Sequence, residues 1–342
     1  MSGNHRGGTT DDSAFWPRRL AQVMVLLVWP LIWVGSLVTT YDAGMSVPDW
    51  PGTYGYNLFL YPISTWILGP FDLFIEHGHR LLAALVGVIA IGFLVASWWQ
   101  ESRRWVTGLA AVVLAAVIGQ GVLGGLRVTM SERTLAMIHG CVAPACFALC
   151  VVAACVTSRR WNRDRVIDSA GNRARTPRSG WALALIVVSY MQLMLGALLR
   201  HAPPTLSPTG FGHVVTTHVT LAFALWVLTG AVAWRSYRCG DLTLSRPAFS
   251  LICLVAVQIL LGVGTWLVNY GYPPLLQELP GSGDYLLQAK AFRSSLVVTS
   301  HVAVGALILA VSTWMWVRWR RRNFVLRDAT KPGVSAERLP TG

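Results

Sequence analysis

Eight long apolar stretches dominate the sequence and constrain its fold more than any other feature. Each is close to the roughly 20 residues that an α-helix needs to cross a bilayer. They lie at about residues 20–40, 80–98, 105–126, 134–157, 180–200, 213–236, 247–269 and 293–317. Charged residues make up only 13% of the 342-residue chain, too few to cover a water-facing surface. The sequence therefore predicts an all-α integral membrane protein with eight transmembrane helices.

The 28 Lys and Arg residues divide unevenly between the two sides of the predicted bundle. With eight spans both termini lie on one side, and that side carries 22 of them. The other side, helix ends included, carries Arg80, Arg127, Arg133, Arg200, Lys290 and Arg293. By the positive-inside rule, we expect a multi-pass protein of the cell inner membrane with both termini cytoplasmic. The net charge of +13 thus follows membrane topology and does not indicate nucleic-acid binding.

The two halves of the chain resemble each other. A QxxLG pattern occurs on the third, fifth and seventh stretches, at Gln120–Gly124, Gln192–Gly196 and Gln258–Gly262. His79-Arg-Leu-Leu-Ala on the second stretch matches His218-Val-Thr-Leu-Ala on the sixth. These matches predict two four-helix bundles that are parallel repeats, related by an axis along the membrane normal.

This arrangement divides the chain into five segments. They are a cytoplasmic leader (1–19), an N-terminal four-helix unit (20–157), a cytoplasmic linker (158–179), a C-terminal four-helix unit (180–317) and a cytoplasmic tail (318–342). The first apolar stretch is too long for a signal peptide and lacks a small-residue cleavage site, so we expect it to remain as a helix.

One histidine stands near the start of each even-numbered stretch: His79, His139, His218 and His301. Even-numbered helices run inward, so these side chains lie at similar depth, within about two turns of the outer surface. Ionisable groups inside a bilayer are costly and usually functional. One such histidine alone is equally well explained by packing, but four in a repeated pattern indicate ligands. The other outer histidines are interpreted as interfacial: His77, His201 and His213.

Paired imidazoles inside four-helix units suit haem iron better than zinc. Zinc requires a third or fourth protein ligand close by, and the cysteines lie deeper or on the other side. Haem iron takes two axial ligands from opposite sides of a flat apolar macrocycle, which facing helices supply. We pair His79 with His139, and His218 with His301. Arginines at the outer rim are candidate partners of the haem propionates: Arg80, Arg127, Arg200 and Arg293.

The halves differ in one acidic residue. Glu76 lies three residues before His79, so both share a face if the helix begins there, whereas Val215 stands three residues before His218. Only the first haem would then have a carboxylate beside it, which indicates chemistry there and electron transfer at the other. The alternative is that Glu76 is a helix N-terminal acid favoured by the dipole.

Several motifs are similar to those of the haem A synthase family. Glu76-His-Gly-His79-Arg80 resembles its ExxHR motif, and Gly44-Met-Ser-Val-Pro48-Asp49-Trp50-Pro51 resembles its first outer loop. Further resemblances to its third and fifth spans lie at Gln120–Arg127 and Gln192–His201, so that about residues 20–318 are covered. One departure is Val47, which stands where many bacterial members carry a cysteine.

The resemblance implies a membrane oxidoreductase that oxidises the C8 methyl group of haem O to a formyl group, giving haem A. In that family the first histidine pair holds the substrate haem, the glutamate is catalytic, and the second pair holds a haem b cofactor. Those roles fall on His79 and His139, on Glu76, and on His218 and His301. Expected partners are the lipid bilayer, a haem O synthase and the assembly of a terminal oxidase.

Two other functions stay open on the residues alone. A di-haem cytochrome b that passes electrons, for example to or from quinone, accounts for four histidines but not for Glu76. A transporter built from parallel repeats uses histidines as proton relays and binds no haem. The aromatic-rich outer loop at 41–75 either covers the substrate site or forms an interfacial aromatic belt.

Overall fold

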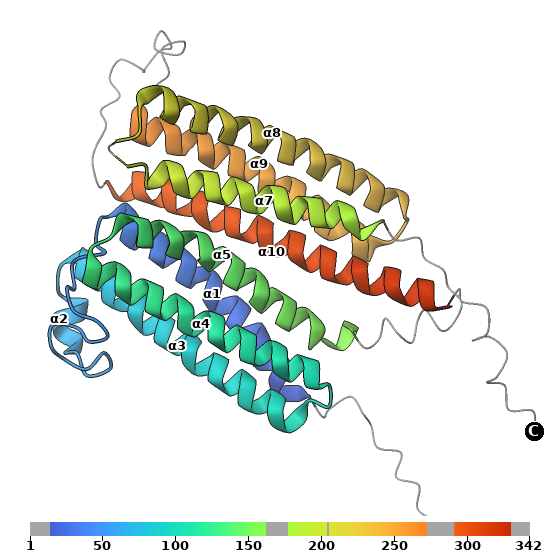
Figure 1. Ribbon diagram of the computed structural model, residues 1–342, viewed down its shortest axis with the longest axis horizontal. Coiled ribbons are helices and arrows are strands. Elements are labelled where there is room, and N and C mark those ends of the chain that lie inside the picture. The colour runs from blue at the N-terminus through green and yellow to red at the C-terminus, as the bar shows by residue number, and fades with distance from the viewer. Residues whose placement is uncertain (1–13, 162–176, 204, 272–290, 330–342) are drawn as a thin grey trace, which may run out of the picture.

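The computed structural model describes residues 14–161, 177–203, 205–271 and 291–329 (Figure 1). Within that part of the chain, eight helices are long and apolar enough to cross a membrane. They are α1 (Phe15–Thr40), α3 (Phe71–Gln100), α4 (Arg104–Met130), α5 (Arg133–Val156), α7 (Ser179–Arg200), α8 (Pro208–Arg238), α9 (Leu242–Tyr270) and α10 (Phe292–Ala329). The prediction of an all-α membrane protein with eight transmembrane helices is confirmed.

Two helices extend well beyond their predicted edges. Helix α3 begins at Phe71, nine residues before the predicted start at 80, so Glu76 lies inside it. Asp72 in its first turn interacts favourably with the helix dipole. Helix α10 continues to Ala329, so the first part of the predicted tail is helical. The unpredicted short helix α2 (Ile63–Ile67) lies in the outer loop between α1 and α3.

The helices pack as two groups of four, which lie one above the other in Figure 1. In the N-terminal group, α1 packs on α3, α3 on α4, α4 on α5, and α5 on α1. In the C-terminal group, α7 packs on α8, α8 on α9, α9 on α10, and α10 on α7. Helix α10 also packs on α1 and α5 and so joins the groups. That the groups are repeats related by an axis stays a prediction.

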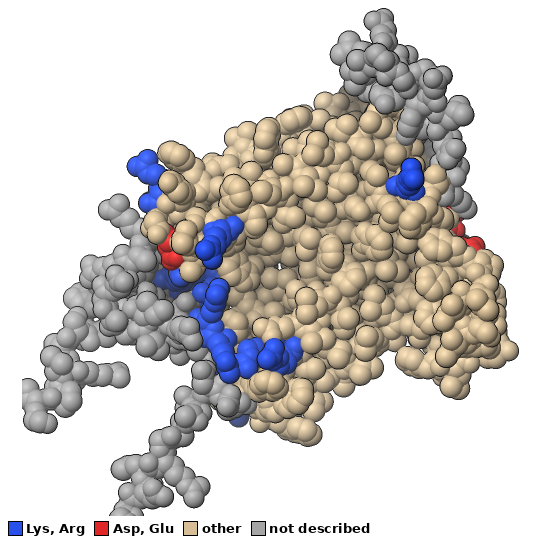
Figure 2. Space-filling model, turned by 180° about the vertical axis from the view of Figure 1, so that it is seen from behind, with Lys and Arg blue, Asp and Glu red and all other residues tan. Residues whose placement is uncertain are grey.

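Basic residues gather at the end of the bundle where α1 begins and α10 ends, as the blue side chains of Figure 2 show. Several of their guanidinium groups lie over tryptophan rings, including Arg235 over Trp181 and Arg321 over Trp161. Arg322 pairs with Asp241 at 2.6 Å. Arginine and tryptophan together are typical of a membrane–water interface.

Candidate functional site

Each of the four span-heading histidines faces a glycine on the preceding membrane-spanning helix. They lie six to ten residues inside their helices, about 9–15 Å from the helix starts at 1.5 Å per residue. A Cβ atom added to the glycine would lie 2.7 to 3.3 Å from Cε1 of the ring. The four pairs are Gly35 with His79, Gly124 with His139, Gly196 with His218, and Gly262 with His301. The glycines therefore make the space that the imidazole rings occupy.

The backbone near each glycine also faces the ring. Nδ1 of His301 lies 3.2 Å from the carbonyl oxygen of Gln258, four residues before Gly262. The carbonyl groups four residues before the other three glycines interact with the other three histidines, without reaching hydrogen-bond geometry. In metal-ligating histidines a partner at one ring nitrogen fixes the tautomer and leaves the other nitrogen for the metal. The arrangement suits Nε2 as the ligand atom.

The histidines lie together in the pairs that the sequence predicts. The rings of His218 and His301 have their centroids 6.4 Å apart. Two imidazoles that bind one metal ion at about 2.0 Å each have centroids about 6 Å apart, so this pair fits the two axial positions of one haem iron. In the N-terminal group, His139 lies close enough to His79 to act on it electrostatically. Ligation itself stays a prediction.

Glu76 is buried on α3, with 2% of its surface exposed, and both of its carboxylate oxygens have partners. Oε2 accepts a hydrogen bond from the backbone N–H of Val47 at 2.9 Å, and Oε1 accepts one from Arg80 at 2.8 Å. Arg80 also donates to the carbonyl oxygens of Val47, Asp49 and Gly52, at 2.6 to 2.8 Å. Arg80, predicted as a propionate partner, thus joins the carboxylate of Glu76 to the outer loop.

The outer loop between α1 and α3, residues 41–70, folds over the end of the N-terminal group (Figure 1). Val47 is fully buried against Tyr61. The indole of Trp50 lies against Gly125 of α4. Burial raises the pKa of the Asp49 carboxyl, but the backbone N–H donors of Gly55 and Tyr54, together with Arg80, outweigh it and hold the pKa below its ordinary value. The loop is therefore held by many contacts directly above Glu76.

The three remaining outer histidines have different surroundings. The interfacial interpretation is wrong for His77, which is 2% exposed beneath the outer loop, with Nδ1 2.9 Å from Oγ1 of Thr53. His213 is exposed, as an interfacial residue is expected to be. Burial and the nearby Arg200 lower the pKa of His201 to about 4, with Arg127 and Arg133 adding to the effect, so its imidazole is neutral at pH 7.

The other predicted propionate partners also differ from one another. Arg127 acts electrostatically on Glu76, His79 and His139. Arg200 donates to the side chain and carbonyl of Ser36 at 2.8 Å and to Thr40 at 2.6 Å, which links α7 to α1. Arg293 is exposed. Arg127 therefore lies best among these residues to meet an acidic group of a ligand at the first histidine pair.

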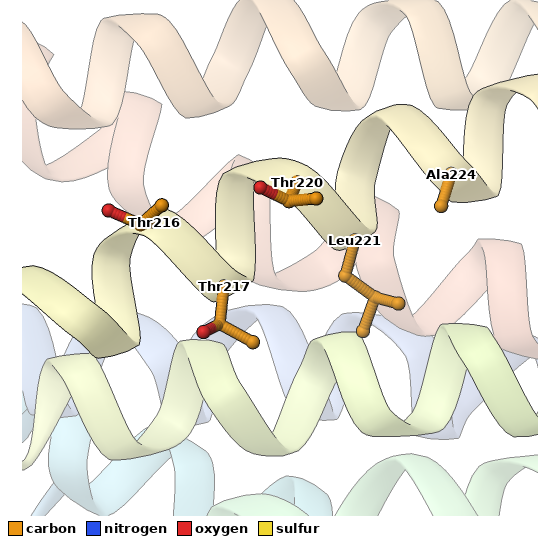
Figure 3. A pocket seen from close by; sticks show the side chains of 5 residues that line it. All are labelled: Thr216, Thr217, Thr220, Leu221 and Ala224. Carbon is orange, nitrogen blue, oxygen red and sulfur yellow. The ribbon is translucent and has the colours of Figure 1, made fainter.

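A shallow groove runs along α8 (Figure 3). It is lined by Thr216, Thr217, Thr220, Leu221 and Ala224. The hydroxyl groups of Thr216 and Thr217 donate to carbonyl oxygens of their own helix. The groove therefore offers mainly methyl and methylene groups, and it suits a lipid chain or an apolar ligand edge.

The close approach of Gly35 to His79 leads to a stability prediction. We expect Gly35→Ala to destabilise the protein by about 1–3 kcal/mol, because the new Cβ displaces the ring of His79. Gly87→Ala on α3, where a Cβ meets nothing within 4 Å, is the matched control. The measurement is the thermal unfolding midpoint of each purified variant. Equal midpoints for the two variants would contradict the packing role of Gly35.

Fold and site together define a helical membrane protein with two partly buried histidine pairs near one end and the buried carboxylate of Glu76 beside one of them. Residues 69–208, which include Glu76, His79 and His139, match the family described as cytochrome oxidase assembly protein. A relative named haem A synthase from Shouchella clausii (strain KSM-K16) is 27% identical over 197 residues. That match covers 57% of this chain and 62% of the relative, less than two thirds of its length.

Two further relatives named haem A synthase match over more of their length. The protein of Caulobacter sp. (strain K31) is 27% identical over 326 residues, 79% of this chain and 92% of the relative. That of Symbiobacterium thermophilum is 29% identical over 297 residues, 77% of this chain and 88% of the relative. These findings confirm the resemblance to the haem A synthase family that the motifs around Glu76 indicate.

Proposed function

We propose that this protein is a haem A synthase, a membrane oxidoreductase that converts the C8 methyl group of haem O to the formyl group of haem A. The observation that carries the proposal is the buried carboxylate of Glu76, held on the helix that also bears His79. The family match and the names of the relatives support the activity. An electron carrier gives no reason for an acid beside one histidine pair only.

The roles of the two helix groups follow from this asymmetry. We assign His79 and His139, in the unit 20–157, to the substrate haem, and His218 and His301, in the unit 180–317, to a haem b cofactor. Bound haem b supplies a carrier for the electrons removed from the substrate. Arg127 is the favoured propionate partner at the first pair. The proposed partners are a haem O synthase and the assembly pathway of a terminal oxidase.

Glu76 acts on the substrate through its charge and its capacity for a proton. Arg80 and the N–H of Val47 hold the carboxylate in one place, so it is oriented before substrate binds. The carboxylate then accepts a proton from the reacting carbon or stabilises positive charge that develops there. The outer loop above it binds the carboxylate through the N–H of Val47, and it binds Arg80 through three carbonyl oxygens.

Haem extraction from the purified protein tests the proposal. We expect haem b together with some haem O or haem A, separated by reversed-phase chromatography. Haem b alone identifies a di-haem electron carrier, and a preparation without a Soret band favours a transporter. Either result overturns the proposed activity.

The uneven charge distribution predicts the orientation in the membrane. Reporter fusions after Arg173 and after Arg327 should both report a cytoplasmic location, because the basic end stays inside. A fusion after Ser131, in the turn between α4 and α5, is the control and should report the outer side. A cytoplasmic location of the Ser131 fusion, or an external location of either arginine fusion, would contradict the predicted orientation in the inner membrane.

A further inference from the structure

Two hydrogen bonds cross between the helix groups at corresponding positions. Nε1 of Trp29 on α1 donates to the carbonyl oxygen of Ala303 on α10 at 3.0 Å. The hydroxyl of Tyr190 on α7 donates to the carbonyl oxygen of Cys141 on α5 at 3.2 Å. In each case the first helix of one group reaches the last helix of the other.

The positions match with respect to the histidine sites. Trp29 lies six residues before Gly35, and Tyr190 lies six residues before Gly196, the two glycines that face His79 and His218. The acceptors Ala303 and Cys141 each lie two residues after a histidine, His301 and His139 respectively. The two contacts are therefore equivalent under the predicted repeat. In each, the donor belongs to one helix group and the acceptor lies beside a histidine of the other group.

Helix α1 holds α10 on both sides of His301. Trp29 binds the carbonyl two residues after it, and Oγ1 of Thr40 lies 3.5 Å from Oγ1 of Thr299, two residues before it. Trp29 also packs against the buried core that contains Ala306 of α10. Each residue of an α-helix turns by about 100°, so a small rotation of α10 moves the ring of His301 relative to His218. Contacts on both sides of His301 prevent such a rotation.

We propose that Trp29 and Tyr190 are positioning residues that orient the histidine pairs across the interface between the groups. Trp29 sets His301 opposite His218, and Tyr190 sets His139 opposite His79. This inference rests on the proposed function, because it concerns haem ligation by these pairs. The proposal has a distinctive consequence. Each aromatic donor controls the histidine pair of the other helix group: Trp29 of the N-terminal group controls the C-terminal pair, and Tyr190 of the C-terminal group controls the N-terminal pair.

The test uses the full-length protein with Trp29→Phe and Tyr190→Phe, which remove the donors and keep an aromatic ring. Trp226→Phe and Tyr237→Phe, both exposed on α8, are the matched controls. We expect Trp29→Phe to shift the reduction midpoint and the low-temperature spectrum of haem b, whereas Tyr190→Phe leaves both unchanged. We expect Tyr190→Phe to raise KM for haem O severalfold, with a smaller change in kcat.

An unshifted haem b in Trp29→Phe, or the same shift in Tyr190→Phe, overturns the crossed positioning role. Should Trp29→Phe fail to accumulate in membranes, the test rests on Tyr190→Phe, which removes a single oxygen atom. A wild-type KM for haem O in Tyr190→Phe then overturns the proposal. Wild-type protein without haem would instead refute the proposed function. A variant with full haem content and wild-type properties refutes only the inference about positioning.

Discussion

Glu76→Gln should lower haem A formation by about 10²- to 10⁴-fold, the usual contribution of a general base. Glutamine has nearly the same size, and its amide oxygen still accepts the hydrogen bond from Val47. It neither accepts a proton at neutral pH nor carries a negative charge. Arg80 keeps its three loop carbonyl partners, so the outer loop stays in place. The variant therefore separates the chemistry of the carboxylate from its structural contacts.

The measurement is chromatography of haems from cells in which the variant is the only copy. We expect haem O or a partly oxidised intermediate to accumulate, while haem b remains bound. Glu132→Gln, an exposed acid at the start of α5, is the control and should leave haem A normal. A helix-dipole role for Glu76 predicts a stability loss of about 1 kcal/mol or less with turnover nearly intact. Normal haem A in Glu76→Gln would remove it from the catalytic residues.

Loss of either cofactor histidine should remove haem b. His218→Ala or His301→Ala removes one of the two proposed haem ligands. Altering even the outer partners of metal ligands costs about 10- to 100-fold in affinity, so losing a ligand itself should leave no tightly bound haem b after purification. The readout is Soret absorbance per mole of protein, with pyridine haemochrome analysis to identify the haem.

His213→Ala is the control for this experiment. It lies on α8 five residues before His218 but is exposed, so its replacement should leave the haem content unchanged. Undiminished haem b in both His218→Ala and His301→Ala would contradict the assignment of this pair.

The features that the sequence predicts well are those that depend on local pattern. Spans follow from apolar length, because a backbone in lipid must satisfy its own hydrogen bonds and forms helices. The four histidines stand out because each recurs at the same place in its span. The sequence also shows the glycines of the QxxLG pattern, but their contact with the rings depends on which helices are neighbours.

The features that the sequence misses depend on contacts between distant residues. Val47 and Glu76 are 29 residues apart, and Trp29 and Ala303 are 274 apart. No periodic pattern indicates that a loop residue reaches a helix residue. For the same reason the sequence pattern indicates only an interfacial position for His77 and only a propionate contact for Arg80. In the structure His77 is buried under the outer loop, and Arg80 binds the carbonyl oxygens of that loop.

The loop above Glu76 is anchored through its main chain. Arg80 binds three backbone carbonyl oxygens, and Glu76 binds a backbone N–H, so none of these contacts depends on which side chain the loop residue carries. Val47 in place of a cysteine keeps all of them. On the loop side these anchoring contacts are made by the main chain alone, so an insertion or deletion between Val47 and Gly52 would displace the acceptors and release the loop.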